Sequence, residues 1–222
     1  MKPVRVLIAD EQTLVVEGLC RILDGYCEVV GRVENGHALI DAVSTMEPDI
    51  VILEVALPLL NGLEAGRRIK LSHPHIKLIY LTSYADYSYV NKAMNYGASG
   101  YLLKRSNVSE LLQSLESVQR GLSYLTPLVT RGLLKGLVRG EFPIKGGLDN
   151  LTSRQREVLQ LVAEGYAVKE IAVLLKLSPK TVAFHKANLM MELQLRTTVA
   201  LTRYAIESGL VVIPKPEFAV AL

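Results

Sequence analysis

The sequence predicts an α/β domain followed by an all-α domain, and three observations support this prediction. In the first half, short apolar runs alternate with helical patterns of about 10–15 residues, which is typical of βαβ units around a parallel sheet. In the second half, helical patterns follow one another with no strand pattern between them. The net charge also changes, from −2 over residues 1–121 to +5 over residues 122–222, which makes the second part the candidate for binding a polyanion.

The overall composition excludes several classes of protein. Half of the 222 residues are hydrophobic, so a disordered or fibrous chain is excluded. The apolar runs are shorter than the ~18 residues that a membrane span needs. The first ten residues, MKPVRVLIAD, hold too few apolar residues between Arg5 and Asp10 for a signal peptide. We therefore expect a cytoplasmic protein that does not associate with a membrane.

Five strands are expected in the first half, and they should form a doubly wound parallel sheet. The expected strands are residues 4–9, 27–33, 49–54, 77–82 and 99–104. The expected helices are residues 13–26, 36–46, 62–72, 87–97 and 107–121. No GxGxxG or Walker sequence is present, so a nucleotide-binding fold would lack its phosphate-binding loop.

Polar side chains stand at the carboxyl ends of four of these five strands. Because the carboxyl ends of parallel strands meet at one edge of a sheet, these side chains should converge there. The residues are Asp10 and Glu11 directly after the first strand, and Glu54, Thr82 and Lys104 at the ends of the third, fourth and fifth. Enzymes of the acid-pocket phosphohydrolase type need a second acid near their nucleophile, and the run LEVAL offers only Glu54. We therefore expect a pocket without enzymatic activity.

This half of the chain resembles the receiver domain of two-component response regulators, and we assign that domain to residues 1–121. The resemblance rests on VLIADEQTLVVEGL, on LT at 81–82 and on GASGYLLK. It implies a flavodoxin-like fold, Mg²⁺ in an acidic pocket of Asp10, Glu11 and Glu54, and a phosphoryl group accepted at the end of the third strand. It also implies a switch made of Thr82, Tyr101 and Lys104.

Glu54 departs from the family, which has aspartate at the phosphoacceptor position. One extra methylene moves the carboxylate by about 1.5 Å, and in-line attack requires tighter placement than that. Phosphorylation would add about −1.5 to −2 charges to an aspartate, whereas Glu54 carries one permanent charge that reaches towards Lys104 and Thr82. Three readings stay open: the glutamate partly mimics the phosphorylated state, it silences the switch so that something else controls the receiver, or some phosphorylation remains.

A partly helical linker is expected over residues 122–148. Residues 127–138, PLVTRGLLKGLV, predict a short helix, and residues 141–150, EFPIKGGLDN, are typical of a flexible joint. Residues 214–222 form the expected tail.

Four helices are expected within residues 149–213. Thr152 and Gln155 form a capping-box pattern, and Ser178 followed by Pro179 is a strong helix start. The expected helices are residues 151–165, 168–177, 177–193 and 197–211. Two short helices joined by KLSP, the second with an exposed N-terminal half, indicate a helix-turn-helix.

This domain resembles the LuxR-type DNA-binding domain through LTSRQREVLQLVAEG, KEIA, SPKTVAFHKANLM and RYAIESGLV. With the receiver, the whole chain is similar to response regulators of the NarL/FixJ class. The resemblance implies binding of double-stranded DNA as a homodimer, and control by a sensor histidine kinase or another regulatory protein.

The resemblance places the DNA-binding residues in the second helix of the motif. Phosphate contacts are expected from a basic and hydroxyl set, whereas the base-reading positions are apolar here and favour thymine methyl groups and DNA shape. Asn188 is the nearest side chain able to make a paired contact with a base, and His185 is expected to pack rather than to read a base. The expected set is Lys180, Thr181 and Lys186 for phosphates, Ala183, Phe184 and Ala187 for bases, and Val182, His185 and Asn188 beside them.

We therefore expect a DNA-binding transcriptional regulator with an atypical receiver, which is independent of phosphorylation or constitutively biased. The alternative is a protein-interaction regulator whose receiver docks a partner, with DNA binding secondary.

Overall fold

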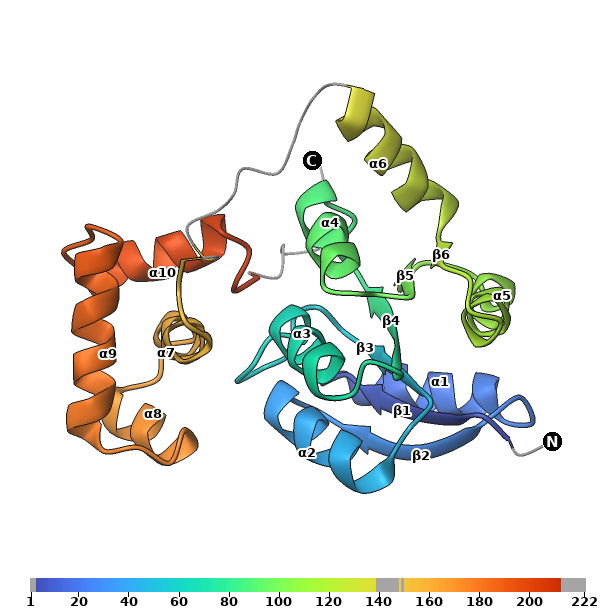
Figure 1. The fold of residues 1–222 in the computed structure, drawn as a ribbon, viewed down its shortest axis with the longest axis horizontal. Helices are drawn as coiled ribbons and strands as arrows, with labels where there is room; N and C mark the ends of the chain where they lie inside the picture. Colours follow the sequence, from blue (N-terminus) through green and yellow to red (C-terminus); the bar gives the residue numbers. More distant parts are fainter. Residues whose placement is uncertain (1–2, 139–147, 149, 213–222) are drawn as a thin grey trace, which may run out of the picture. The chain divides into compact units, whose positions relative to one another are not determined.

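The computed structural model describes residues 3–138, 148 and 150–212. The chain divides into two compact units, Met1–Ile144 and Lys145–Leu222, and each is considered separately (Figure 1). The expected tail and most of the expected joint lie outside the described residues. Within those residues, no helix has both the length and the apolar character to cross a bilayer.

The first unit is a parallel sheet in the order β2-β1-β3-β4-β5-β6. The order shows that the chain crosses over helices between parallel neighbours, as the doubly wound prediction requires. The strands are β1 (Arg5–Ala9), β2 (Glu28–Val33), β3 (Ile50–Leu53), β4 (Lys77–Thr82), β5 (Gly100–Leu103) and β6 (Tyr124–Leu125). All four residues of β3 are buried, because helices cover this central strand on both faces.

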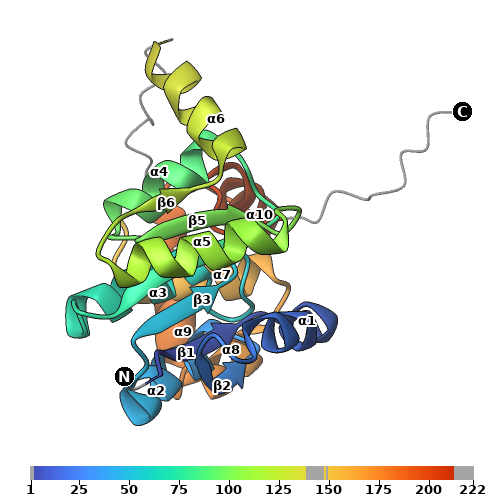
Figure 2. The ribbon, with the colours of Figure 1, turned by 90° about the vertical axis from the view of Figure 1, so that its right-hand side faces the viewer.

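Helices cover both faces of this sheet (Figures 1 and 2). On one face α1 (Thr13–Leu23) and α5 (Val108–Gln119) share an apolar cluster with β1, β3, β4 and β5. The opposite face is covered by α2 (Gly36–Met46), α3 (Gly62–Ser72) and α4 (Tyr87–Asn95). The α/β prediction is therefore confirmed.

The sheet has one strand more than the sequence predicts. β6 lies in the expected linker and pairs parallel with β5, with Leu125 opposite Tyr101. A run of two strand residues is too short to show the period-two pattern by which strands are recognised. The chain then continues into α6 (Pro127–Val138), which packs along α4 and buries Val129. This segment therefore belongs to the first unit rather than to a free linker.

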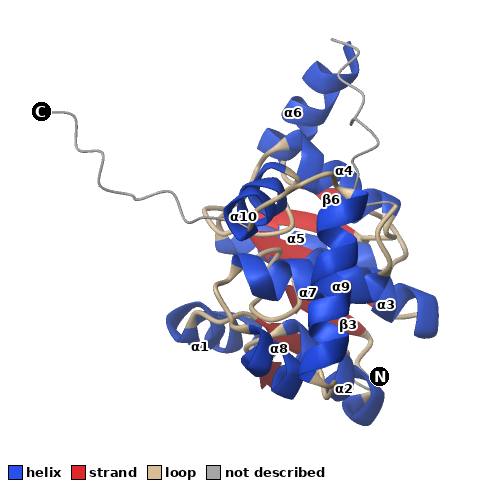
Figure 3. Ribbon diagram, turned by 90° about the vertical axis from the view of Figure 1, so that its left-hand side faces the viewer, coloured by secondary structure: helices blue, strands red, loops and turns tan. Residues whose placement is uncertain are grey.

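The second unit is helical and its helices follow the predicted ones closely (Figure 3). They are α7 (Ser153–Ala163), α8 (Val168–Leu174), α9 (Pro179–Glu192) and α10 (Thr198–Glu207). The predicted capping box is present, because Thr152 accepts from the Gln155 amide and Gln155 accepts from the Thr152 amide. At α8, where residue 167 is an alanine, the Glu170 carboxylate accepts the Ala167 N–H at 2.7 Å and satisfies that donor instead.

Candidate functional site

The polar residues predicted at the strand ends of the first unit do meet at one edge of the sheet. Two backbone hydrogen bonds extend the ladder one residue beyond the strands, Glu54 N–H to the Ala9 carbonyl at 2.9 Å and Lys104 N–H to the Thr82 carbonyl at 2.8 Å. The four strand ends are thereby held level. Asp10, Glu54 and Thr82 are buried there, at 3%, 5% and 0% exposure.

Lys104 bridges the two buried carboxylates. Its Nζ lies 2.7 Å from Asp10 Oδ2 and 2.8 Å from Glu54 Oε2. Burial alone would lower the pKa of this ammonium, but the neighbouring carboxylates outweigh burial, so that its pKa is raised. The lysine therefore stays charged and supplies the positive charge that two buried acids require.

The other carboxylate oxygen of Glu54 accepts three hydrogen bonds. Glu54 Oε1 accepts the backbone N–H groups of Val55 at 2.6 Å and Ala56 at 3.2 Å, because the chain turns back over the side chain after β3. It also accepts a short hydrogen bond from the Thr82 hydroxyl. Both oxygens of this acid are thus held by fixed donors.

A chain of contacts leads from Glu54 to Tyr101. Thr82 Oγ1, which donates to Glu54, accepts the backbone N–H of Tyr84 at 3.3 Å. The Tyr84 carbonyl in turn accepts the Tyr101 hydroxyl at 2.7 Å. Tyr101 is fully buried, and burial and then the charge of Glu54 raise its pKa far above the usual range of a phenol. The three predicted switch residues therefore contact Glu54 directly or through one backbone segment.

Glu11 differs from the other pocket residues because it is exposed. Partial burial and then the neighbouring Asp10 raise the pKa of its carboxyl. Asp10 itself accepts the Gln12 N–H at 2.9 Å with the oxygen that does not face Lys104. Across the described part of the chain, no three His, Cys, Asp or Glu side chains are grouped so as to hold a metal ion.

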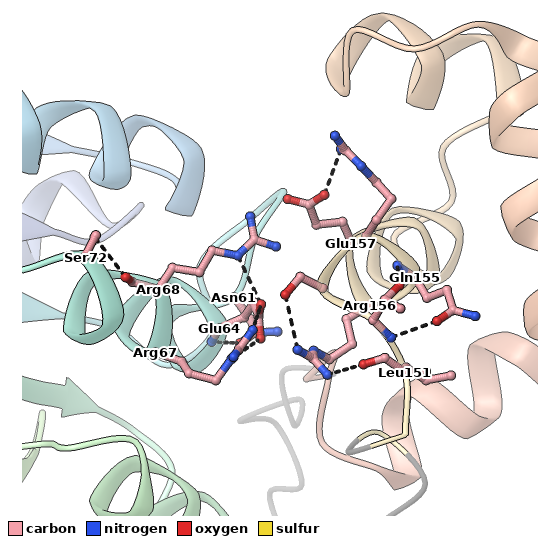
Figure 4. A network of polar contacts seen from close by, with 12 residues as sticks. Asn61, Glu64, Arg67, Arg68, Ser72, Leu151, Gln155, Arg156 and Glu157 are labelled. Carbon is pink, nitrogen blue, oxygen red and sulfur yellow. Dashed lines mark hydrogen bonds and ion pairs between the residues drawn. The ribbon is translucent and has the colours of Figure 1, made fainter.

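The start of α3 lies against the backbone of Glu54. Gly62 lies so close to the strand end that a Cβ atom there would be 1.9 Å from the Glu54 carbonyl oxygen. Asn61 caps this helix by accepting the Glu64 N–H at 2.9 Å, and the Glu64 carboxylate receives Arg67 and Arg68 (Figure 4). An Asn-Gly pair is the sequence signal for this turn. No sequence signal predicts that the Tyr84 carbonyl accepts the Tyr101 hydroxyl, because every residue has a backbone carbonyl.

The second candidate site is the outward face of α9 in the helical unit. Ser178 caps this helix by accepting the Thr181 N–H at 3.0 Å, and Pro179 follows at the first helical position. In the same unit, Arg156 of α7 donates to the Leu151 carbonyl and fixes the segment before α7 (Figure 4). α8 and α9 then form the predicted helix-turn-helix.

Most of the predicted DNA-binding residues are accessible on this face, with one exception. Thr181, His185, Lys186 and Asn188 are half-buried, and Lys186 Nζ donates to the Thr198 hydroxyl at 2.8 Å. Val182 is fully buried, so it lies in the core of the unit and not on this face. The exposed members are Lys180, Ala183, Phe184 and Ala187.

An α/β unit with an acid pocket at its strand ends, followed by a helix-turn-helix unit, defines a class of two-domain regulators. Comparison with known proteins identifies the family. Residues 6–116 match the response regulator receiver domain, and residues 149–205 match the bacterial regulatory proteins of the luxR family.

Several known proteins are similar over nearly the whole chain. The transcriptional regulatory protein DegU of Brevibacillus brevis is 31% identical over 222 residues, which cover 93% of this chain and 94% of the relative. The oxygen regulatory protein NreC of Staphylococcus carnosus is 32% identical over 213 residues, 93% of this chain and 98% of the relative. The solved structure of the RcsB response regulator of Salmonella typhimurium superimposes with a TM-score of 0.60 at 28% identity, over 92% of this chain and 98% of that one.

The chain therefore belongs to the response regulators of the NarL/FixJ class, with a receiver domain and a LuxR-type helix-turn-helix domain. Its relatives are DNA-binding transcriptional regulators, and receiver domains commonly bind Mg²⁺ at their phosphorylation site.

Proposed function

We propose that this protein is a DNA-binding transcriptional regulator whose receiver carries Glu54 at the phosphoacceptor position and acts independently of phosphorylation. We further propose that it binds double-stranded DNA as a homodimer through α9. Solved structures of its relative RcsB include the RcsB–DNA complex and two RcsB dimers bound to two parallel DNAs, which supports this part of the proposal.

One observation carries the proposal for the receiver: the Glu54 side chain contacts both Thr82 and Lys104, and Lys104 also contacts Asp10. The longer side chain takes one oxygen to the ammonium and the other to the hydroxyl. Since the side chain itself makes these contacts, they do not depend on a phosphoryl group. The contact chain through Tyr84 then keeps Tyr101 buried, so the glutamate holds the receiver in one arrangement.

The same contacts oppose phosphorylation of Glu54. Attack on a phosphodonor needs a carboxylate oxygen placed in line with it. Three donors hold Oε1 of Glu54 and the Lys104 ammonium holds Oε2, so neither oxygen can move into line without breaking a contact. Nor does the arrangement fit Mg²⁺, since the Lys104 ammonium lies between the two buried carboxylates that would face the ion. We propose that Lys104 supplies the countercharge, that the pocket has no enzymatic activity, and that any sensor kinase or other regulatory partner acts by binding.

The test compares the protein with Glu54→Gln, Glu54→Ala and Glu54→Asp in DNA binding and in dimer formation. Glu54→Gln keeps the size of the side chain and removes its charge, so it is the matched variant. We expect Glu54→Gln and Glu54→Ala to bind DNA at least about tenfold more weakly, a change equivalent to about 1.4 kcal/mol. We expect the parent to be unaffected by a small phosphodonor with Mg²⁺, and Glu54→Asp to respond to it.

Two results would contradict the proposal. If Glu54→Ala binds DNA as tightly as the parent, the glutamate does not hold an active arrangement. If the parent responds to the phosphodonor, its receiver is not independent of phosphorylation. Absence of binding to any DNA at low salt would favour the alternative, a regulator that acts by docking a protein partner.

A further inference from the structure

One stripe of exposed residues runs along α9 and contains almost no hydrogen-bonding groups. Its positions are spaced by three and four residues, so they lie on one face of the helix. Val182 and Leu189, both fully buried, mark the opposite face, which packs against the other helices of the unit. The stripe consists of Lys180, Ala183, Phe184, Ala187 and Met191.

Phe184 is the residue that projects from this stripe. Its side chain is 63% exposed, although burying a phenyl group is worth about 1.5–3 kcal/mol. Ala183 and Ala187 on either side are short, so the ring stands above its neighbours. The ring of His185 lies edge-on at 6.2 Å between ring centroids. Because the Ser178 cap fixes the start of the helix, the ring is carried by a rigid element.

The chemistry of the major groove determines which base such a ring can accept. Guanine and adenine present hydrogen-bond donors and acceptors there, and cytosine presents a donor beside its C5–H. Thymine alone carries a methyl group at this edge. A phenyl ring placed over a donor or acceptor removes it from water and gives it no partner, which costs free energy. A ring placed against a methyl group buries apolar surface on both sides and gains free energy.

We propose that Phe184 determines DNA specificity by contacting the 5-methyl group of a thymine in each half-site. The proposal rests on the proposed DNA-binding function and adds the base that is recognised and the group by which it is recognised. Lys180, exposed in the first turn of the helix, then contacts a phosphate and contributes equally to all sequences.

The test begins by selecting tight-binding duplexes from a random-sequence pool with the full-length protein. Each thymine of a selected duplex is then replaced singly by 2′-deoxyuridine, which removes only the methyl group. We expect one or two positions in each half-site at which binding weakens about fourfold, the effect of one buried methyl group. A duplex with 5-methylcytosine·G in place of that T·A pair should bind more tightly than the same duplex with C·G there.

Three variants assign the effect to the ring. Phe184→Ala should bind the thymine and uracil duplexes equally well. Met191→Ala removes an apolar side chain that is 74% exposed on the same stripe but near the end of the helix, and it should keep the uracil effect. Lys180→Ala should weaken binding of both duplexes by the same factor.

Several outcomes would overturn the proposal. One is a selected duplex in which no thymine responds to uracil, and another is a Phe184→Ala protein that still discriminates against uracil. If Phe184→Ala weakens binding of the thymine and uracil duplexes by the same factor, the ring makes a contact that does not depend on sequence. The proposal also fails in that case. If no duplex is enriched even at low salt, the proposed DNA-binding function fails together with it, which distinguishes that failure from the others.

Discussion

At the scale of single residues, the pocket combines features that the sequence shows with one that it does not. The positions of Asp10, Glu54, Thr82 and Lys104 follow from the rule that parallel strands end at one edge of the sheet. The burial of Tyr101 beneath the Tyr84 carbonyl does not follow from any local pattern, because it depends on where a backbone oxygen lies in space. Side-chain chemistry was therefore predictable here, and its coupling through the backbone was not.

The buried tyrosines of the first unit should make the protein sensitive to alkali. Burial, and then the charges of Asp86 and Tyr84, raise the pKa of Tyr89 from 10.0 to about 12. The folded state therefore keeps a proton that the unfolded state loses above pH 10, and the free energy of unfolding falls as pH rises from 10 to 12. We expect Tyr89 to contribute a loss of about 1 kcal/mol at pH 11.

Urea unfolding measured between pH 8 and pH 11.5 checks this expectation, with Tyr89→Phe as the matched variant. The variant cannot ionise at this position, so its stability should fall less steeply with pH than that of the parent. Tyr101 and Lys104, whose pKa values are also raised, leave a common slope in both proteins. Identical slopes in parent and variant would show that Tyr89 ionises freely in the folded protein.

At the scale of secondary-structure elements, the long segments were predictable and the short one was not. Helices with N-terminal caps, such as α7 and α9, match their sequence patterns. β6 was missed because its two residues are fixed by pairing: Tyr124 N–H donates to the Ser99 carbonyl at 3.0 Å and Thr126 N–H to the Tyr101 carbonyl at 3.2 Å. Tertiary pairing, rather than local preference, makes this a strand.

The packing of α6 on α4 can be tested with two adjacent residues of opposite exposure. Val129 is 2% exposed and Leu128 is 50% exposed, although both are apolar residues of the same helical turn. We expect Val129→Ala to lower the free energy of unfolding by about 1–2 kcal/mol, since it removes buried methyl groups. Leu128→Ala should change it by less than about 0.5 kcal/mol.

The measurement is denaturant unfolding followed by a signal from the first unit, with amide hydrogen exchange of residues 124–134 as the local readout. Faster exchange in Val129→Ala, but not in Leu128→Ala, would show that α6 is held by this contact. Equal effects of the two substitutions would mean that α6 does not pack on α4 in solution.

At the scale of the whole molecule, the distribution of charge separates the two halves of the chain. The net charge of +5 after residue 121 predicted a polyanion partner for that part. The helical unit, residues 145–222, holds +3 of this charge, and residues 122–144 of the first unit hold the other +2. Composition alone did not specify which lysines face outward. Lys180 is exposed, whereas Lys186 is half-buried and donates to the Thr198 hydroxyl.

The salt dependence of DNA binding should therefore depend on residues of the second unit only. Each phosphate contact contributes about −0.9 to the slope of log K against log salt concentration, because it releases condensed counterions. We expect Lys180→Ala to reduce the magnitude of this slope by about one. The matched variant is Arg21→Ala, which removes an exposed cation from α1 of the receiver and should leave the slope unchanged. Binding titrations at several salt concentrations measure both slopes. An equal reduction in the two variants would mean that the receiver also contacts DNA. The inference that only the second unit contacts phosphates would then be wrong.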